Sequence, residues 1–269
     1  MRYEPIKDSL GKVFNHNPLL RKLFYHLLDL LLLRAWHIKH ELRAIRNKIG
    51  DKATVLDAGT GFGQYSFFMS RLSDFWIIKG AEINPVQVAD NNHFFKQIRE
   101  SGRIRFFQAD LTQYREEDTY DLIVCVDVME HIEEDVKVFQ NYHASLKEGG
   151  ILLISTPSDK GGSDVHDDDD HSFIDEHVRE GYNIDDMKEK LKYAGFSRTE
   201  CHYSYGKAGS LSWHLSMKYP ISLLNVTKFF FILLPFYYAI TFPLCLILNY
   251  IDLKNYHEEG TGLIVKAWK

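Results

Sequence analysis

The chain has little cysteine, and its three cysteines stand far apart. Cys125, Cys201 and Cys245 follow neither a metal-ligand spacing nor the pattern of a disulfide framework, so we expect reduced thiols and a cytoplasmic setting. The chain also lacks an excess of basic residues. Its formal net charge is −5 over 269 residues, which argues against a nucleic-acid substrate. Internal repeats and a signal-peptide layout at the amino terminus are also missing. The length fits one α/β domain with additions.

The positions of three glycines are more informative than the glycine content of the chain. Residues 55–63 read V-L-D-A-G-T-G-F-G, in which Asp57 precedes Gly59, Gly61 and Gly63. This pattern predicts a strand, a tight turn whose backbone lies against a ligand, and a helix that begins near Gln64. The dinucleotide fingerprint is G-x-G-x-x-G, whereas here an acid stands before three alternating glycines. The spacing therefore favours a nucleoside ligand without phosphate groups.

Three further acids follow predicted strands. Glu82 ends the strand 76–82, Asp110 ends 103–110, and Asp127 ends 120–127. The strands alternate with predicted helices at 85–100, 133–146 and 184–194, which is typical of a parallel sheet whose ligands bind beyond the strands' carboxyl ends. At this edge Glu82 can accept hydrogen bonds from both ribose hydroxyls and would repel a 2′-phosphate.

A fifth predicted strand, 149–157, completes a recognisable series. In this order the five segments resemble the class I S-adenosylmethionine-dependent methyltransferases. The runs D-V-M-E-H-I (127–132) and L-K-E-G-G-I-L-L-I-S-T-P (146–157) are especially similar to the branch that includes ubiquinone-biosynthesis O-methyltransferases. The resemblance covers 54–199 and the last few residues. It implies an α/β fold with a Rossmann-like seven-stranded sheet, in which five parallel strands are followed by an antiparallel pair (197–205 and 262–268).

The resemblance also implies roles for individual residues, with S-adenosylmethionine as cofactor and no metal. Residues of the glycine turn would hold the cofactor, Glu82 would bind the ribose, Asp110 with Leu111 would face the adenine, and Asp127 would lie near the methionine portion. Tyr65 either shields the sulfonium or adenine or is a buried structural residue. The predicted cofactor-binding set is Asp57, Gly59, Gly61, Gly63, Tyr65, Glu82, Asp110, Leu111 and Asp127.

An oxygen acceptor must lose a proton during methyl transfer, and histidine suits this because its ordinary pKa lies near neutrality. We expect His131, after the fourth strand, and His177, after the fifth, to be the catalytic residues. His166 and His171 flank four aspartates (167–170) in a loop that could hold a cation, but a solvated acidic loop is the commoner outcome, so no metal site is assigned.

The remaining segments extend the expected core. We divide the chain into an N-terminal helical extension (1–50), the methyltransferase core (51–207), an apolar helical insertion (208–258) and the final strand (259–269). Residues 18–49 predict a long helix or a broken pair, capped by Asn17. It either covers the sheet edge or forms a lid that touches substrate or membrane.

The insertion contains 23 residues without a charge, 229–251, enough to qualify as a membrane span by length. A single crossing would separate two strands of one sheet, and Pro220, Pro235 and Pro243 are expected to cut the region into short pieces. We therefore expect a hairpin of short helices. It either completes the core over the substrate mouth or dips into one leaflet; a true span remains the third alternative.

Together these observations predict a methyltransferase that acts on a small, lipophilic, hydroxylated acceptor, with O-methylation favoured. The expected location is cytoplasmic, with peripheral contact of 221–251 on the inner face of the membrane. A nicotinamide-dependent oxidoreductase and a non-catalytic, membrane-docked relative are the alternatives.

Overall fold

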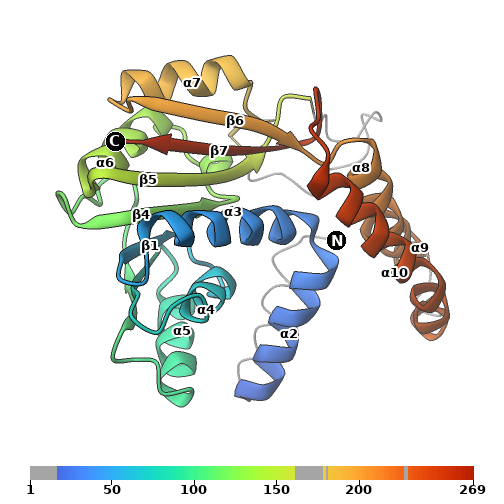
Figure 1. Ribbon diagram of the computed structural model, residues 1–269. Helices are drawn as coiled ribbons and strands as arrows, with labels where there is room; N and C mark the ends of the chain where they lie inside the picture. The colour runs from blue at the N-terminus through green and yellow to red at the C-terminus, as the bar shows by residue number, and fades with distance from the viewer. Residues whose placement is uncertain (1–16, 161–177, 180, 227–229) are drawn as a thin grey trace.

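The computed structural model describes residues 17–160, 178–179, 181–226 and 230–269. Its centre is a seven-stranded sheet of order β3-β2-β1-β4-β5-β7-β6, in which β1 to β5 are parallel and β7 runs antiparallel to both of its neighbours (Figure 1). This confirms the fold class expected from the sequence. The strands are β1 (Thr54–Ala58), β2 (Ile77–Glu82), β3 (Ile104–Gln108), β4 (Tyr120–Val126), β5 (Leu146–Pro157), β6 (Arg198–Ser204) and β7 (Gly262–Trp268).

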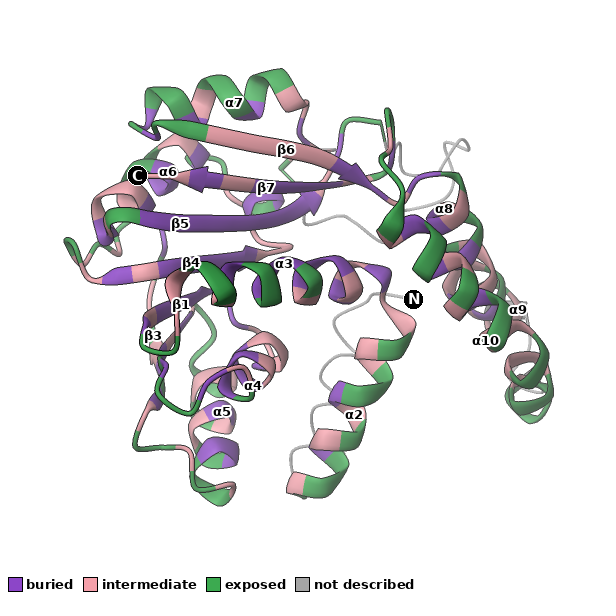
Figure 2. Ribbon diagram, viewed as in Figure 1, coloured by how far each residue is buried: buried purple, intermediate pink, exposed green. Residues whose placement is uncertain are grey.

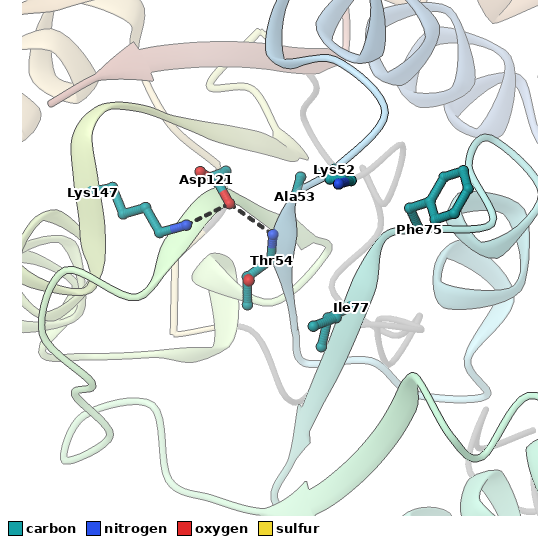
Figure 3. A pocket seen from close by; sticks show the side chains of 7 residues that line it. All are labelled: Lys52, Ala53, Thr54, Phe75, Ile77, Asp121 and Lys147. Atoms are coloured by element: carbon teal, nitrogen blue, oxygen red, sulfur yellow. Dashed lines mark hydrogen bonds and ion pairs between the residues drawn. The ribbon is translucent and has the colours of Figure 1, made fainter.

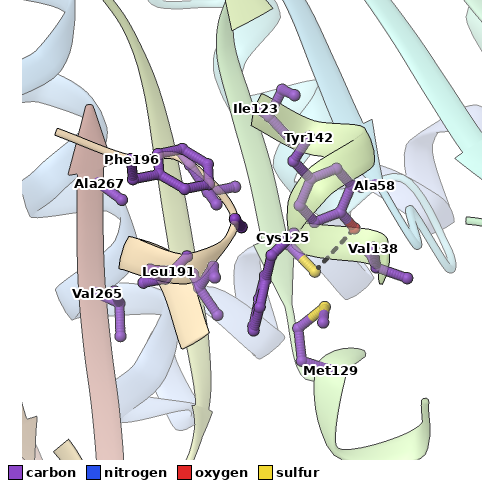
Figure 4. Close-up of a cluster of buried hydrophobic side chains, with 14 of the residues drawn as sticks. Ala58, Ile123, Cys125, Met129, Val138, Tyr142, Leu191, Phe196, Val265 and Ala267 are labelled. Carbon is purple, nitrogen blue, oxygen red and sulfur yellow. Dashed lines mark hydrogen bonds between the residues drawn. The ribbon is translucent and has the colours of Figure 1, made fainter. Parts of the chain in front are cut away.

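Helices cover both faces of the sheet. On one face α6 (Asp135–Ser145) and α7 (Ile184–Tyr193) pack against the sheet around Tyr142, whose hydroxyl lies 3.5 Å from Cys125 Sγ (Figure 4). On the other face lie α3 (Leu33–Ile49), α4 (Gln64–Ser70) and α5 (Pro85–Gln97). Because the strands are covered on both sides, β1, β4 and β5 are buried along most of their length (Figure 2).

The N-terminal segment is a broken helix pair. The helix α2 (Pro18–Leu31) begins at Asn17, whose side chain accepts a hydrogen bond of 2.8 Å from the backbone N–H of Leu19. It ends at Leu31; Leu32 has an extended backbone, and α3 begins after it at Leu33. The expected cap and the broken pair are both confirmed.

The insertion is a hairpin, as expected, but its helices are not all short. Its first arm consists of α8 (Lys207–Trp213), a π-helical turn (His214–Lys218) and α9 (Tyr219–Val226), but its second arm is one helix of 25 residues, α10 (Phe230–Lys254). The expectation that Pro235 and Pro243 would break this segment is wrong. An interior proline removes one backbone hydrogen bond at a cost of about 3 kcal/mol, yet the helix continues through both prolines and contacts α8 of the first arm.

The π-helical turn shows how the two arms hold each other. A wide turn leaves carbonyl groups without their usual i+4 partners. Tyr237 of α10 donates a hydrogen bond of 2.7 Å to the carbonyl of Leu215, and Tyr238 donates one of 2.8 Å to the carbonyl of Ser216. These two tyrosines therefore supply hydrogen-bond donors to carbonyl groups of the turn and fix how the two arms of the hairpin are aligned.

Candidate active site

The glycine turn lies at the carboxyl end of β1. The backbone N–H groups of Gly59 and Thr60 donate to the carbonyl of Ala81 on β2, at 2.9 and 3.1 Å. Gly59, Gly61 and Gly63 all have positive φ angles (73°, 50° and 75°), which disfavours other residues. The turn therefore has the backbone conformation that the glycine spacing predicted.

The glycines differ in what surrounds them. A Cβ atom on Gly59 would lie 2.2 Å from Val128 Cγ2, whereas a Cβ atom on Gly61 would have no atom of the described residues within 4 Å. Gly59 is thus required by internal packing. Gly61 instead faces open space on the side where a side chain would stand.

Asp57 lies at the end of β1 but does not face this space. Its side chain is buried and accepts hydrogen bonds from the hydroxyls of Thr60 (2.9 Å) and Ser66 (2.6 Å). Burial raises the pKa of this carboxyl, although the two hydroxyls oppose the shift. In this arrangement Asp57 braces the turn, and its contribution to ligand binding is indirect.

Glu82, at the end of β2, is connected directly to the turn. Its Oε2 accepts a hydrogen bond of 2.9 Å from the N–H of Gly61, and its Oε1 accepts one of 3.1 Å from the N–H of Asn84. Each carboxylate oxygen has two lone pairs. The carboxylate is therefore held in place while it keeps acceptor capacity for a diol.

The end of β3 is joined to the same edge, because the N–H of Ala109 donates to the carbonyl of Glu82 at 3.0 Å. Asp110 is exposed there, and its Oδ1 accepts from the hydroxyl and the N–H of Thr112 (2.7 and 2.9 Å). These two hydrogen bonds lower the pKa of Asp110. Leu111 next to it is 8% exposed. The structure thus brings Asp110 to the edge that also carries Glu82.

Asp127 follows β4 in a left-handed conformation (φ 51°) and forms an ion pair with Arg34 of α3. The backbone N–H of Arg34 also donates to the hydroxyl of Tyr205 at 3.0 Å. Sequence reasoning missed Arg34, because a single arginine in a charged helix carries no signal of its distant partner.

Two more N-terminal residues contact the glycine turn and were also missed. Arg21 and Tyr25 of α2 are both buried and donate hydrogen bonds to the carbonyl of Phe62, the one from Arg21 Nη2 at 2.8 Å. Asn91 of α5 donates to the carbonyl of Gly61 at 2.8 Å. Helices α2 and α5 therefore hold the turn from outside the core strands.

Tyr65, in the first turn of α4, has a buried hydroxyl group. Burial raises its pKa to about 12, although the nearby Arg34 guanidinium opposes the shift. The position of this neutral phenol next to Arg34 is compatible with a residue that shields the cofactor. Because the hydroxyl is enclosed, it is equally compatible with a buried structural residue.

His131 and Glu130 lie in a short 3₁₀ turn, Met129–His131, after Asp127. The side chain of His131 is exposed, whereas Glu130 is 1% exposed and accepts a hydrogen bond of 3.0 Å from Thr156 Oγ1. Burial raises the pKa of Glu130, and the neighbouring His131 opposes the shift. The second predicted catalytic residue, His177, lies outside the described residues. Val178, which follows it, donates a backbone hydrogen bond of 3.0 Å to the carbonyl of Glu130.

Within the described ranges, no group of three or more His, Cys, Asp or Glu side chains has metal-binding geometry. The aspartates at 167–170, together with His166 and His171, lie in the part that is not described. The prediction that the site needs no metal therefore stays a prediction.

Two hollows lie elsewhere on the molecule. One, of 340 Å³, is at the opposite ends of the strands, where Lys147 Nζ and the N–H of Thr54 both bond to Asp121 (Figure 3). The other, of 620 Å³, lies against the β3 edge and is lined by Phe107 and Tyr114 among others. Neither includes the glycine turn.

Comparison with known proteins agrees with this geometry. A family model described as a methyltransferase domain matches residues 25–215. The chain is 31% identical over 162 residues to phosphoethanolamine N-methyltransferase 1 of Triticum aestivum, covering 55% of this chain and 29% of that protein. It is 29% identical over 117 residues to "Probable (S)-tetrahydroprotoberberine N-methyltransferase 2" of Papaver bracteatum, covering 43% of this chain and 32% of that protein. The chain thus spans about a third of the length of these relatives.

Solved structures share the fold. Phosphoethanolamine N-methyltransferase 2 of Haemonchus contortus, in complex with S-adenosyl-L-methionine, matches with a TM-score of 0.58 at 18% identity, over 86% of this chain and 52% of that one. The 4+2 cyclase SpnF matches with a TM-score of 0.57 at 16% identity, over 86% of this chain and 81% of that one. At such identities these likenesses show the fold alone, and none of the comparisons singles out the ubiquinone O-methyltransferase branch.

Proposed function

Because the chain belongs to the methyltransferase-domain family, we propose that it transfers a methyl group from S-adenosylmethionine to a small acceptor molecule. The observation that carries this proposal is the open space at Gly61 next to the carboxylate of Glu82. The backbone there is free of a side chain, and the charged group that contacts it, Glu82, is an acceptor of hydrogen bonds. That combination suits a nucleoside and disfavours a phosphate.

The residues at the sheet edge fit an adenosyl group. Glu82 is fixed by two backbone N–H groups and would accept the ribose hydroxyls, while Asp110 and Leu111 would bind the adenine. Asp127 with Arg34 would lie at the amino-acid end. When bound, the cofactor supplies a methyl group that its sulfonium already activates. The protein therefore mainly has to align the acceptor for in-line attack and exclude water.

For an oxygen acceptor, which the sequence resemblance favours, the chain must also remove a proton. His131 is exposed beside the site, so its imidazole can reach an acceptor there and take the proton. His177 remains the second proposed base.

A nitrogen acceptor is the second candidate, and the names of both curated relatives favour it. A neutral amine attacks through its lone pair, so no base is needed before the methyl group moves. The two acceptor classes therefore differ in how strongly they should depend on His131.

We also propose that the acceptor is lipophilic and that the protein works in the cytoplasm at the membrane surface. The support is the position of Arg34, which pairs with Asp127 and lies where the apolar helices α2 and α10 approach α3.

Two measurements test the proposed function. Isothermal titration should show binding of S-adenosylhomocysteine and none of NAD, and the reverse result would favour the oxidoreductase alternative. Extracts incubated with the protein and an isotopically labelled methyl donor should yield a labelled small molecule. Binding of the nucleoside without any labelled product from lipid or aqueous extracts would favour the non-catalytic alternative.

A further inference from the structure

Helix α10 presents a continuous apolar stripe to solvent. The stripe contains Phe236, Ile240, Leu244, Ile247 and Ile251, spaced by three or four residues so that they share one face of the helix. Phe236 is 70% exposed and Ile240 is 79% exposed. Only 6% of the most apolar part of Phe231–Lys254 is buried inside the protein. Such exposure is unusual for a helix of a folded domain.

This helix is long enough to cross a membrane, but its place in the chain excludes a single crossing. The insertion leaves the sheet after β6 and returns to it at β7, and these strands pair from Arg198↔Trp268 to Ser204↔Gly262. A single span would place the two paired strands on opposite sides of a bilayer. The stripe runs along the helix, so a helix that lies flat on a surface would bury it.

Helix α2 carries a second stripe of the same kind. Leu20, Leu23, Leu27 and Leu30 are exposed at helical spacing, and Leu19 is 73% exposed next to them. Because this face points away from the buried Arg21 and Tyr25, it does not contribute to the core.

The two stripes start from one junction at the first turn of α3. Helix α2 ends one residue before α3, and the insertion is tied to the same turn by the hydrogen bond from Arg34 N to the Tyr205 hydroxyl and by the pair His37–Asp252. From there α2 and α10 run away from the sheet on the same side of the molecule (Figures 1 and 2). Asp127 and its partner Arg34 lie at this junction.

The charged residues of the hairpin indicate which kind of surface it binds. Between residues 205 and 257 the sequence has four lysines (Lys207, Lys218, Lys228 and Lys254) and one acid, Asp252, which is buried. The acid of α2, Asp29, is paired with Lys39. The hairpin 207–254 is therefore basic in a chain whose net charge is −5, and the exposed acids Glu258 and Glu259 lie just beyond it. Apolar stripes beside lysines, with no exposed acid between 205 and 257, complement an anionic lipid surface.

We propose that α2 and the hairpin of α8 to α10 form one membrane-docking surface, which lies flat on an anionic bilayer and buries both apolar stripes at the headgroup boundary. The surface is a property of the folded chain and does not depend on methyl transfer. Docking in this way would bring the Arg34–Asp127 edge to the bilayer surface.

Sedimentation of the full chain with vesicles tests the proposal. The protein should bind vesicles of phosphatidylcholine with 30% phosphatidylglycerol and should bind pure phosphatidylcholine at least tenfold more weakly, with added salt weakening the binding. The double variants Ile240→Glu/Ile247→Glu and Leu23→Glu/Leu27→Glu should each lower partitioning at least tenfold. The matched control is Phe75→Glu, because Phe75 is 66% exposed in the turn before β2 and should not matter.

Circular dichroism and binding of S-adenosylhomocysteine show whether each variant is folded. If the wild type does not bind anionic vesicles, or if both stripe variants bind as it does, the proposal is wrong. It is also wrong if analytical ultracentrifugation shows a dimer that the stripe variants dissociate while vesicle binding is unchanged, since the stripes would then meet a second copy of the chain.

Discussion

His37 Nε2 lies 2.9 Å from Asp252 Oδ1, and both side chains are buried although 215 residues separate them. The same carboxylate accepts hydrogen bonds from the backbone N–H groups of Gly209 (3.0 Å) and Tyr205 (3.2 Å). One aspartate thus joins the end of α10, the start of α8 and the helix α3. It fixes the insertion to the part of the fold that braces the candidate active site.

Replacing Asp252 by asparagine should weaken this joint. The amide cannot accept hydrogen bonds at both of its termini, so we expect Asp252→Asn to lower the free energy of unfolding by about 2–3 kcal/mol. Urea denaturation followed by circular dichroism measures this change in the free energy of unfolding. Limited proteolysis should show earlier cleavage between residues 207 and 254. An unchanged midpoint together with unchanged proteolysis would contradict this role.

The stability lost in Asp252→Asn should also depend on pH. Burial raises the pKa of Asp252, but the hydrogen bond from His37 and the nearby His257 outweigh burial, so the pKa is lowered overall. A lowered folded pKa contributes stability above the unfolded value, about 3.9, which is lost as the pH falls through the folded value. The difference in stability between wild type and Asp252→Asn should therefore shrink below about pH 4.

The glycines of the turn allow a cleaner separation of folding from binding. Gly61→Ala should cost only the left-handed conformation, about 1–2 kcal/mol, because nothing lies within 4 Å of the new Cβ atom. It should nevertheless lower the affinity for S-adenosylhomocysteine at least tenfold, since the methyl group occupies the open space. Thermal denaturation and isothermal titration measure the two effects.

Gly59→Ala should behave in the opposite way. Its Cβ atom would lie 2.2 Å from Val128 Cγ2, so overpacking adds about 1–3 kcal/mol to the conformational cost. The melting temperature should fall further than for Gly61→Ala. Equal losses of stability and of affinity in the two variants would contradict the distinction between a packing glycine and a ligand-facing glycine.

The sequence predicted the sheet well because most strands are short apolar runs with a clear end, although β6 is mostly polar and β5 begins at Leu146, earlier than expected. Strand β7 begins and ends where expected, and the acids Glu82, Asp110 and Asp127 do follow β2, β3 and β4. Parallel register then brings them to one edge, since Ala58 pairs with both Ala81 and Cys125. This part of the site follows from local patterns and from topology.

The parts that could not be predicted depend on contacts between distant segments. Arg34 pairs with Asp127 across 93 positions, and Tyr237 and Tyr238 bond to carbonyls that are free only because a π-helical turn forms. The continuity of α10 through Pro235 and Pro243 also departs from the local rule, which predicts a break at each interior proline. Local periodicity contains no information about such partners.

Glu82→Gln tests the predicted ribose contact. Glutamine can still accept the hydrogen bond from the N–H of Gly61 and loses the one from the N–H of Asn84, so the fold should be retained with a small loss of stability. One terminus of the side chain becomes a donor, and it can no longer accept from a second hydroxyl. We expect the affinity for S-adenosylhomocysteine to fall 10- to 100-fold, a loss of about 1.4–2.8 kcal/mol. Glu117→Gln, at an exposed acid paired with Arg115, is the matched control and should bind as the wild type does.

His131→Asn distinguishes the two acceptor classes. If the acceptor is a hydroxyl group and His131 is its base, turnover should fall 10²- to 10⁴-fold while the affinity for S-adenosylhomocysteine is unchanged. The remaining rate should then rise with pH, because hydroxide ionises the acceptor in place of the imidazole. If the acceptor is an amine, the loss should stay below about tenfold.

The matched control is His93→Asn, at an exposed histidine that interacts with Gln97 on α5. His177→Asn belongs in the same series. A full rate for both His131→Asn and His177→Asn with a hydroxylated acceptor would show that neither histidine removes the proton.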